Sequence, residues 1–270
     1  GEMKDLRKDP PMLGASSVQF EVSNRVEGHA LGGLSPMVTM VQKLGLTSMI
    51  HKMAPIFKYR RQNHESDHVL SFALNTLAGG TCLEDFEKLR QSEALLKNLC
   101  ARSLPDPTTA GDFCRRVDPQ QIEKLQDVFN SARTAVWKQQ PDEFFDEAII
   151  EADGTTVGTL GECKDGMQLS YMGIWGYAPL MVSLAKTQEP LFIFNREGSA
   201  WSALGAAGYF DRAIDVCRTA GFKNSLLRGD TDISQSEYLD GWNEQGVRFV
   251  FGYQGRETLV SKANSIAESD

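Results

Sequence analysis

Two aspartates, Asp153 and Asp230, each follow a short apolar segment and could together hold a metal ion. Asp153 closes residues 148–152, and Asp230 closes residues 225–229. An apolar run of four to eight residues bounded by turn formers is typical of a buried strand. Open α/β sheets bind their ligands at such strand ends. Two carboxylates meeting at one point would repel each other unless a hard cation lay between them, so the pair predicts Mg²⁺ or Mn²⁺.

Aspartate is also common in β-turns and at helix N-caps, which gives each residue a purely structural alternative. Asp153 could stabilise a turn with Gly154, and Asp230 or Asp232 could cap the helix that follows. Asp230 directly ends its strand and is the preferred second ligand. Asp232 could serve as an alternative ligand, or could contact a ligand without touching the ion. A metal held by the pair would suit phosphoryl transfer, in which it activates water and stabilises a leaving 3′ oxygen.

The elements that must position these residues are predicted in the second half of the chain, residues 141–270. Alternating apolar runs and turn residues predict an α/β fold with the order β-β-β-α-β-α-β. Strands within 148–194 suit an antiparallel meander, and residues 176–185 are expected to be one of them. The order is that of a ribonuclease-H-like mixed sheet, in which the first and fourth strands are neighbours. Asp153 and Asp230 would meet there. The expected elements after the meander are helix 205–219, strand 225–229, helix 235–245 and strand 247–253.

The first 140 residues have a different, helical pattern. Residues 1–30 are expected to form an arm with an alternating stretch at 17–22, and residues 31–140 an all-helical region. Met37, Met40 and Met49 are expected in helix core. The domain boundary is placed at the Gln139–Asp142 break. Helices are predicted at about 35–44, 68–77 (apolar almost all round), 83–91, 92–101, 108–117 and 118–139.

Composition limits the classes of function. Residues 1–140 carry a net charge of +2 and residues 141–270 a net charge of −10, giving −8 in total, and an acidic second half on average repels nucleic acid. Five scattered cysteines without a C-x-x-C pair argue against a cysteine zinc site and a disulfide framework. All four histidines lie in the first 68 residues, so the second half cannot contain a His-dependent triad. No apolar run is long enough to cross a membrane and no signal-peptide centre is present, so a cytoplasmic protein without membrane association is expected.

Several short segments, taken in order, resemble bacterial insertion-sequence transposases of the DDE class. The similarity is greatest to the group called transposase DDE domain group 1, and it covers about Leu31 to Tyr253. No single segment is specific; their order and spacing carry the resemblance. The segments are Glu151–Thr155, Trp175–Leu180, Asn195–Gly198, Arg228–Asp230 and Val247–Val250.

The resemblance implies a catalytic domain in which Asp153 and Asp230 are the family's first two aspartates. It further implies a divalent metal, binding to the element's terminal inverted repeats, strand cleavage, and transfer of 3′ ends into target DNA, with a homodimer as one arrangement of the synaptic complex. The third carboxylate of the family normally follows an inserted subdomain beyond the strand matched by 247–253. The sequence stops at Asp270, so we expect a truncated, inactive fragment in which Glu257 is the nearby acidic alternative.

Two other functions remain open at this stage. Residues 151–155 resemble the first motif of haloacid-dehalogenase-like phosphatases, and residues 229–231 their acidic motif, although the nucleophile position is Glu151 and the meander fits that fold poorly. The chain could also be a catalytically inactive DNA-binding fragment. Its phosphate contacts would be Lys58, Arg60, Arg61, Arg115 and Arg116.

Two tryptophans could stack on an unpaired base. Trp175 lies in a predicted strand region and is expected in the core, whereas Trp201 lies in a loop rich in small residues and is undecided.

Overall fold

The structure is a computed structural model that describes residues 11–13, 30–57, 63–161 and 164–266. The chain divides into two compact units, Gly1–Ala135 and Val136–Asp270. The expected strand at 17–22 lies outside the described residues. Within the described part of the chain, no helix combines the length and apolarity that crossing a bilayer requires.

The first unit is helical, as the pattern predicts. Its core is formed by leucines and other apolar residues that recur along the helices, including Ile50, Leu74 and Leu99. The helices are α1 (Leu34–Lys43), α2 (Leu46–Met53), α3 (Glu65–Leu77), α4 (Phe86–Arg90), α5 (Glu93–Asn98), α6 (Pro107–Cys114) and α7 (Pro119–Trp137), with a 3₁₀ turn η2 (Leu83–Asp85) before α4.

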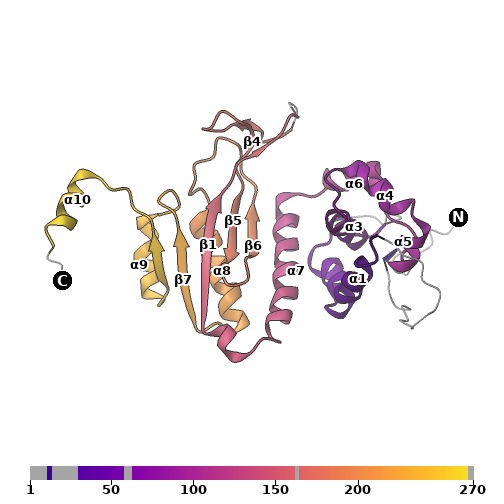
Figure 1. The fold of residues 1–270 in the computed structure, drawn as a ribbon, viewed down its shortest axis with the longest axis horizontal. Helices are drawn as coiled ribbons and strands as arrows, with labels where there is room; N and C mark the ends of the chain where they lie inside the picture. Colours follow the sequence, from indigo (N-terminus) through magenta and orange to yellow (C-terminus); the bar gives the residue numbers. More distant parts are fainter. Residues whose placement is uncertain (1–10, 14–29, 58–62, 162–163, 267–270) are drawn as a thin grey trace. The chain divides into compact units, whose positions relative to one another are not determined.

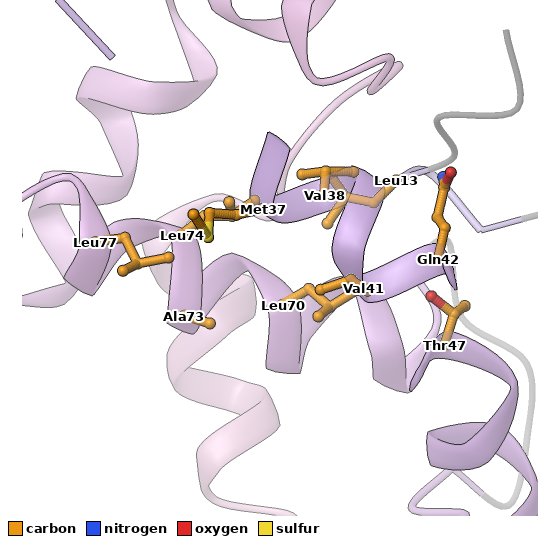
Figure 2. Close-up of a pocket in the computed structure, with 10 residues that line it drawn as sticks. All are labelled: Leu13, Met37, Val38, Val41, Gln42, Thr47, Leu70, Ala73, Leu74 and Leu77. Carbon is orange, nitrogen blue, oxygen red and sulfur yellow. The ribbon is translucent and has the colours of Figure 1, made fainter. Parts of the chain in front are cut away.

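Some apolar residues of this unit are more exposed than the sequence predicts. Met37 and Met40 of α1 are exposed, so their assignment to the core is wrong. The helix at 68–77, apolar almost all round in sequence, is expected to be buried, but Leu77 at its end is exposed. A small apolar cavity of about 40 Å³ lies beside Met37 and Leu77, lined chiefly by side chains of α1 and α3 (Figure 2). Helical periodicity alone therefore overestimates how many apolar side chains of α1 and α3 are buried.

The second unit contains a five-stranded mixed sheet with the order β6-β5-β1-β7-β8. β1 pairs antiparallel with β5 and parallel with β7; β5 and β6 are antiparallel, and β7 and β8 are parallel. The ribonuclease-H-like prediction is confirmed, with the first strand central and next to the fourth. The elements are η3 (Asp142–Phe145), β1 (Glu147–Gly154), β5 (Leu180–Leu184), β6 (Glu189–Phe194), α8 (Ala206–Ala220), β7 (Asn224–Gly229), α9 (Ser236–Glu244), β8 (Arg248–Phe251) and α10 (Glu257–Asn264).

One face of this sheet forms the core with α8, which packs against four of the strands (Figure 1). Alternate residues of β1 are buried, as expected for a strand with one face in the core, and Ile150 packs in the same cluster as Phe210 and Ile214 of α8. Gly221, with φ +113°, ends α8 in the left-handed conformation that glycine adopts readily. The core therefore fixes the positions of β1 and β7.

The predicted strand at 176–185 is wrong, because two strands in different sheets occupy it. β4 (Trp175–Tyr177) forms a small sheet with β2 (Val157–Gly158) and β3 (Gln168–Leu169), whereas β5 begins only at Leu180. Pro179 lies between them and has no N–H to donate to a ladder. Gly176 lets β2 approach β4 closely, since a Cβ there would lie 2.0 Å from the carbonyl oxygen of Val157.

Candidate active site

The parallel register of β1 and β7 places Asp153 and Asp230 in corresponding positions. Glu151 is opposite Arg228, and Ala152 is opposite Gly229. Asp153 and Asp230 come one residue beyond the last of these pairs. Neighbouring strands lie about 4.8 Å apart, and side chains two residues apart share a face. The two aspartates therefore follow Glu151 and Arg228 on the same face, at the end where both strands finish.

Asp230 uses one carboxylate oxygen to organise the loop after β7. Its Oδ1 accepts hydrogen bonds from the backbone N–H groups of Asp232 and Ile233, both at 3.0 Å. Within the described residues, Oδ2 of Asp230 has no hydrogen-bond partner, and neither has the exposed carboxylate of Asp153. The residue that precedes α9 is Gln235, so α9 is not capped by Asp230 or Asp232. Asp230 thus has a structural role with one oxygen and leaves the other available to a ligand.

The charge beside the two aspartates is partly balanced. Glu151 and Arg228 form an ion pair across the two strands, and Glu147 forms a second one with Arg248 of β8. These pairs lie on the face of the sheet opposite the buried residues of β1. Asp153 and Asp230 have no such cationic partner among the described residues. The uncompensated negative charge on this face is therefore concentrated at its end, where a cation would be attracted.

Arg196 is buried beside the end of β1 and holds the neighbouring loops through their carbonyl oxygens. It is only 4% exposed, and its Nε donates to the carbonyl oxygen of Ala178 at 2.6 Å. Its Nη1 donates to the carbonyl oxygens of Ser202 at 2.6 Å and Leu204 at 3.1 Å. Its Nη2 lies 3.2 Å from where a Cβ of Gly154 would be, and burial lowers the pKa of the guanidinium. The sequence offered no signal for this role beyond the segment Asn195–Gly198.

The alternative acidic residues lie elsewhere on the surface. Asp232 is exposed two residues after Asp230 and contributes its backbone N–H to the turn. Glu257 is exposed in the first turn of α10, a helix without buried residues, and no contact within the described residues links it to Asp153.

The cations predicted to contact DNA are only partly described. Lys58, Arg60 and Arg61 lie outside the described residues. Arg115 is exposed and forms an ion pair with Asp112. Arg116 lines a cavity of about 390 Å³ in the helical unit, whose wall also includes His68, Arg90, Asp106 and Phe113. The structure brings Arg116 near aromatic and acidic groups that the sequence did not associate with it.

Both tryptophans that could stack on a base are exposed, which contradicts the prediction for Trp175 and decides the open case of Trp201. Trp175 is 56% exposed in β4, so its assignment to the core is wrong: the strand belongs to the small three-stranded sheet and not to the central one. Trp201 is also 56% exposed, in the loop that Arg196 holds by its carbonyl groups.

Comparison with known proteins gives a family and two structural likenesses. No curated protein matches the chain. Among the solved structures that match is a piggyBac transposase synaptic complex with hairpin DNA, at 12% identity and a TM-score of 0.45, covering 87% of this chain and 54% of that one. Another is the Mos1 transposase paired-end complex with the left transposon end, at 10% identity and a TM-score of 0.24, covering 72% of this chain and 60% of that one. The chain thus spans between half and two thirds of these proteins' lengths. The model of the family described as transposase DDE domain group 1 matches residues 20–270, and the chain belongs to that family.

Proposed function

We propose that Asp153 and Asp230 are the catalytic carboxylates of a transposase that cleaves the ends of an insertion sequence and transfers them to target DNA. The observation that carries this proposal is the parallel register of β1 and β7, which puts both residues on one face at one end of the sheet. Family membership supports the reaction class, a polynucleotidyl transfer.

The residues at this position fit a divalent cation such as Mg²⁺ or Mn²⁺. Both candidate ligands are carboxylates, and hard cations prefer oxygen ligands. Oδ1 of Asp230 is held by two backbone N–H groups, which fixes the direction of the carboxylate and leaves Oδ2 to face the ion. When bound, the cation supplies Lewis-acid activation of water and stabilisation of the leaving oxygen. Asp232 and Glu257 are secondary candidates that could complete or support the ligand set.

DNA is the proposed partner. Both structural likenesses are complexes that contain transposon or hairpin DNA, and the family as a whole acts in transposition. For this chain we propose binding to the terminal inverted repeats and to target DNA, with a homodimer in the synaptic complex. The helical region 31–140 and its cations Lys58, Arg60, Arg61, Arg115 and Arg116 are the proposed phosphate contacts. The acidic second half would approach phosphates only with its metal bound.

A phosphatase of the haloacid-dehalogenase-like type fits less well. The antiparallel strands β5 and β6 form the meander that was already difficult to reconcile with that fold. Hydrolysis of an aryl phosphate with Mg²⁺ by the purified chain, lost in Asp153→Asn, would favour the phosphatase over the transposase.

The test is strand cleavage and transfer by the protein on a duplex that carries the element's terminal repeat, with Mg²⁺ or Mn²⁺. We expect Asp153→Asn and Asp230→Asn each to reduce the rate at least about 100-fold while leaving DNA binding intact, because each removes a charged ligand of the ion. Asp240→Asn, an exposed aspartate of α9 away from the site, is the matched control and should retain full activity. Wild-type rates in either site variant would refute the assignment.

A further inference from the structure

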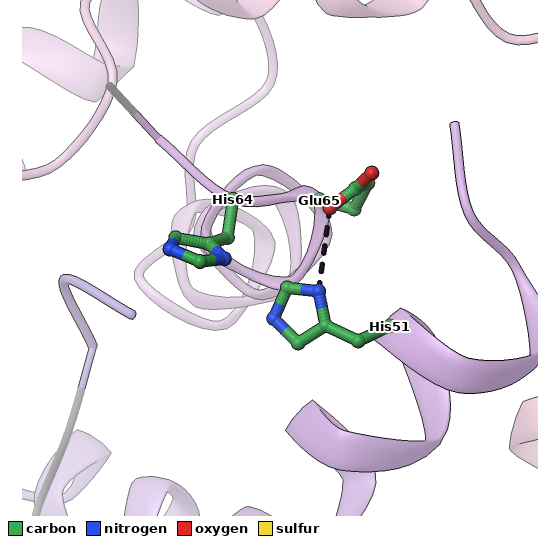
Figure 3. A group of neighbouring side chains, drawn as sticks. All are labelled: His51, His64 and Glu65. Atoms are coloured by element: carbon green, nitrogen blue, oxygen red, sulfur yellow. Dashed lines mark ion pairs between the residues drawn. The ribbon is translucent and has the colours of Figure 1, made fainter. Parts of the chain in front are cut away.

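Three side chains of the helical unit converge where α2 ends and α3 begins. His51 lies in the last turn of α2, His64 directly precedes α3, and Glu65 is its first residue. One donor atom from each residue lies within 4.8 Å of the other two. Figure 3 shows the His51 ring reaching from α2 toward the Glu65 carboxylate, with the His64 ring beside them. Nδ1 of His51 is 3.3 Å from Oε2 of Glu65, and the two imidazole rings are 4.9 Å apart between centroids.

Further hydrogen bonds fix the orientation of two of these side chains, Glu65 and His51. Oε1 of Glu65 accepts from the backbone N–H groups of Phe57 at 2.9 Å and Ile56 at 3.3 Å, so Oε2 is the oxygen directed at His51. Nε2 of His51 lies 3.1 Å from the hydroxyl of Ser66, which is fully buried. A histidine that ligates a metal through one ring nitrogen is usually held by a hydrogen bond at the other. The arrangement therefore presents Nδ1 of His51 and Oε2 of Glu65 as a fixed pair of donors.

We propose that His51, His64 and Glu65 bind one divalent transition-metal ion of the zinc type. Two imidazoles and one carboxylate are a donor set that suits Zn²⁺, whereas Mg²⁺ prefers oxygen ligands only. The set contains no cysteine, so the absence of a C-x-x-C pair does not bear on it. Three protein ligands leave a fourth position for water or another ligand. The site goes beyond the proposed function and uses none of its residues.

The bound ion would connect the end of α2 to the start of α3. Residues 54–64 separate the two helices in the sequence, and an ion held by His51, His64 and Glu65 would join the end of α2 to the start of α3 directly. A metal that binds the folded state and not the unfolded chain stabilises the fold by an amount that grows with the logarithm of its concentration relative to the dissociation constant. An ion pair between His51 and Glu65 would also join the helices, but it does not require His64. His64 therefore distinguishes metal binding from a simple ion pair.

The experiment titrates the metal-free full chain with Co²⁺, then displaces it with Zn²⁺. The chain carries Asp153→Asn and Asp230→Asn, so that loss of the proposed catalytic ion cannot be confused with loss of this site. We expect one Co²⁺ per chain, with visible absorption typical of nitrogen and oxygen ligands. His64→Ala should weaken binding at least about 100-fold, because it removes a direct ligand. The matched control is Cys82→Ser, which removes an exposed thiol that could bind metal adventitiously and should leave the affinity unchanged.

A second measurement uses the chain without substitutions at these histidines, in case His64→Ala does not fold. Modification of histidines by diethyl pyrocarbonate is followed by peptide mass spectrometry with and without Zn²⁺, and His29 serves as the internal reference. We expect Zn²⁺ to slow modification of His51 and His64 relative to His29. Equal Co²⁺ affinity in His64→Ala, loss of binding in Cys82→Ser, or unchanged reactivity of both histidines would overturn the proposal.

Discussion

The two oxygens of Asp230 allow its structural and catalytic roles to be separated by two substitutions at one position. Oδ1 accepts hydrogen bonds from the N–H groups of Asp232 and Ile233, while Oδ2 is available to a metal. Asn at this position keeps a carbonyl oxygen that can take the place of Oδ1 but loses the charge. Ala loses both. Asp230→Asn and Asp230→Ala should therefore differ in their effect on the free energy of unfolding, but both should weaken metal binding.

The expected magnitudes follow from the contacts. Loss of a side-chain acceptor that satisfies backbone N–H groups at a chain turn costs about 1–2 kcal/mol, and Asn is about as good an acceptor as Asp in such positions. We expect Asp230→Ala to lower the free energy of unfolding of the second unit by about 1–2 kcal/mol. For Asp230→Asn the loss should stay below about 0.5 kcal/mol. Both variants should lose Mn²⁺ affinity by at least about tenfold, as expected when a charged ligand is removed.

Urea unfolding followed by tryptophan fluorescence measures the first quantity. All four tryptophans, Trp137, Trp175, Trp201 and Trp242, lie in Val136–Asp270, so the signal reports on the unit that contains the site. Mn²⁺ binding is followed by electron paramagnetic resonance of the free ion. Retention of Mn²⁺ affinity in Asp230→Asn would refute the assignment of Asp230 as a ligand. Equal destabilisation by Asn and Ala would refute the role given to Oδ1.

Three further predictions concern other parts of the chain. Burial lowers the pKa of His68 to about 4, so below about pH 6.5 the unfolded chain takes up a proton that the folded chain resists. The free energy of unfolding should therefore fall by about 3 kcal/mol between pH 6.5 and 4. His68→Gln should remove this part of the loss, as measured by urea unfolding followed by circular dichroism. Arg196→Met should lower the unfolding free energy of the second unit by about 3–5 kcal/mol, because buried carbonyl groups lose a charged donor; a loss below about 1 kcal/mol in urea unfolding would contradict this. Gly176→Ala should increase hydrogen exchange of β2 and β4 peptides, because its methyl group would collide with the carbonyl oxygen of Val157, while exchange in α8 peptides serves as the control.

The sequence predicts the central part of the fold well because local signals there agree with one another. The apolar runs before Asp153 and Asp230 form β1 and β7, and the helix predicted at 205–219 is α8, which ends before Gly221. The order of the elements then determines which strands are neighbours. Each of these features depends on residues close together in the sequence or on a known sheet order.

Features that depend on contacts between distant segments were not predictable in this way. The apolar stretch 176–185 is divided between two sheets because Gly176 must fit against β2, and this partner lies about 20 residues earlier. Trp175 becomes exposed for the same reason. The grouping of His51 with Glu65 depends on the path of the chain between α2 and α3, for which periodicity gives no information.

The ion pair between Glu151 and Arg228 has a consequence for how the sheet attracts cations. On this face the Glu151–Arg228 pair of β1 and β7 is electrically neutral, whereas Asp153 and Asp230, which follow it, carry two negative charges. Attraction for a cation along β1 and β7 is therefore strongest at the end of the strands where the two aspartates lie.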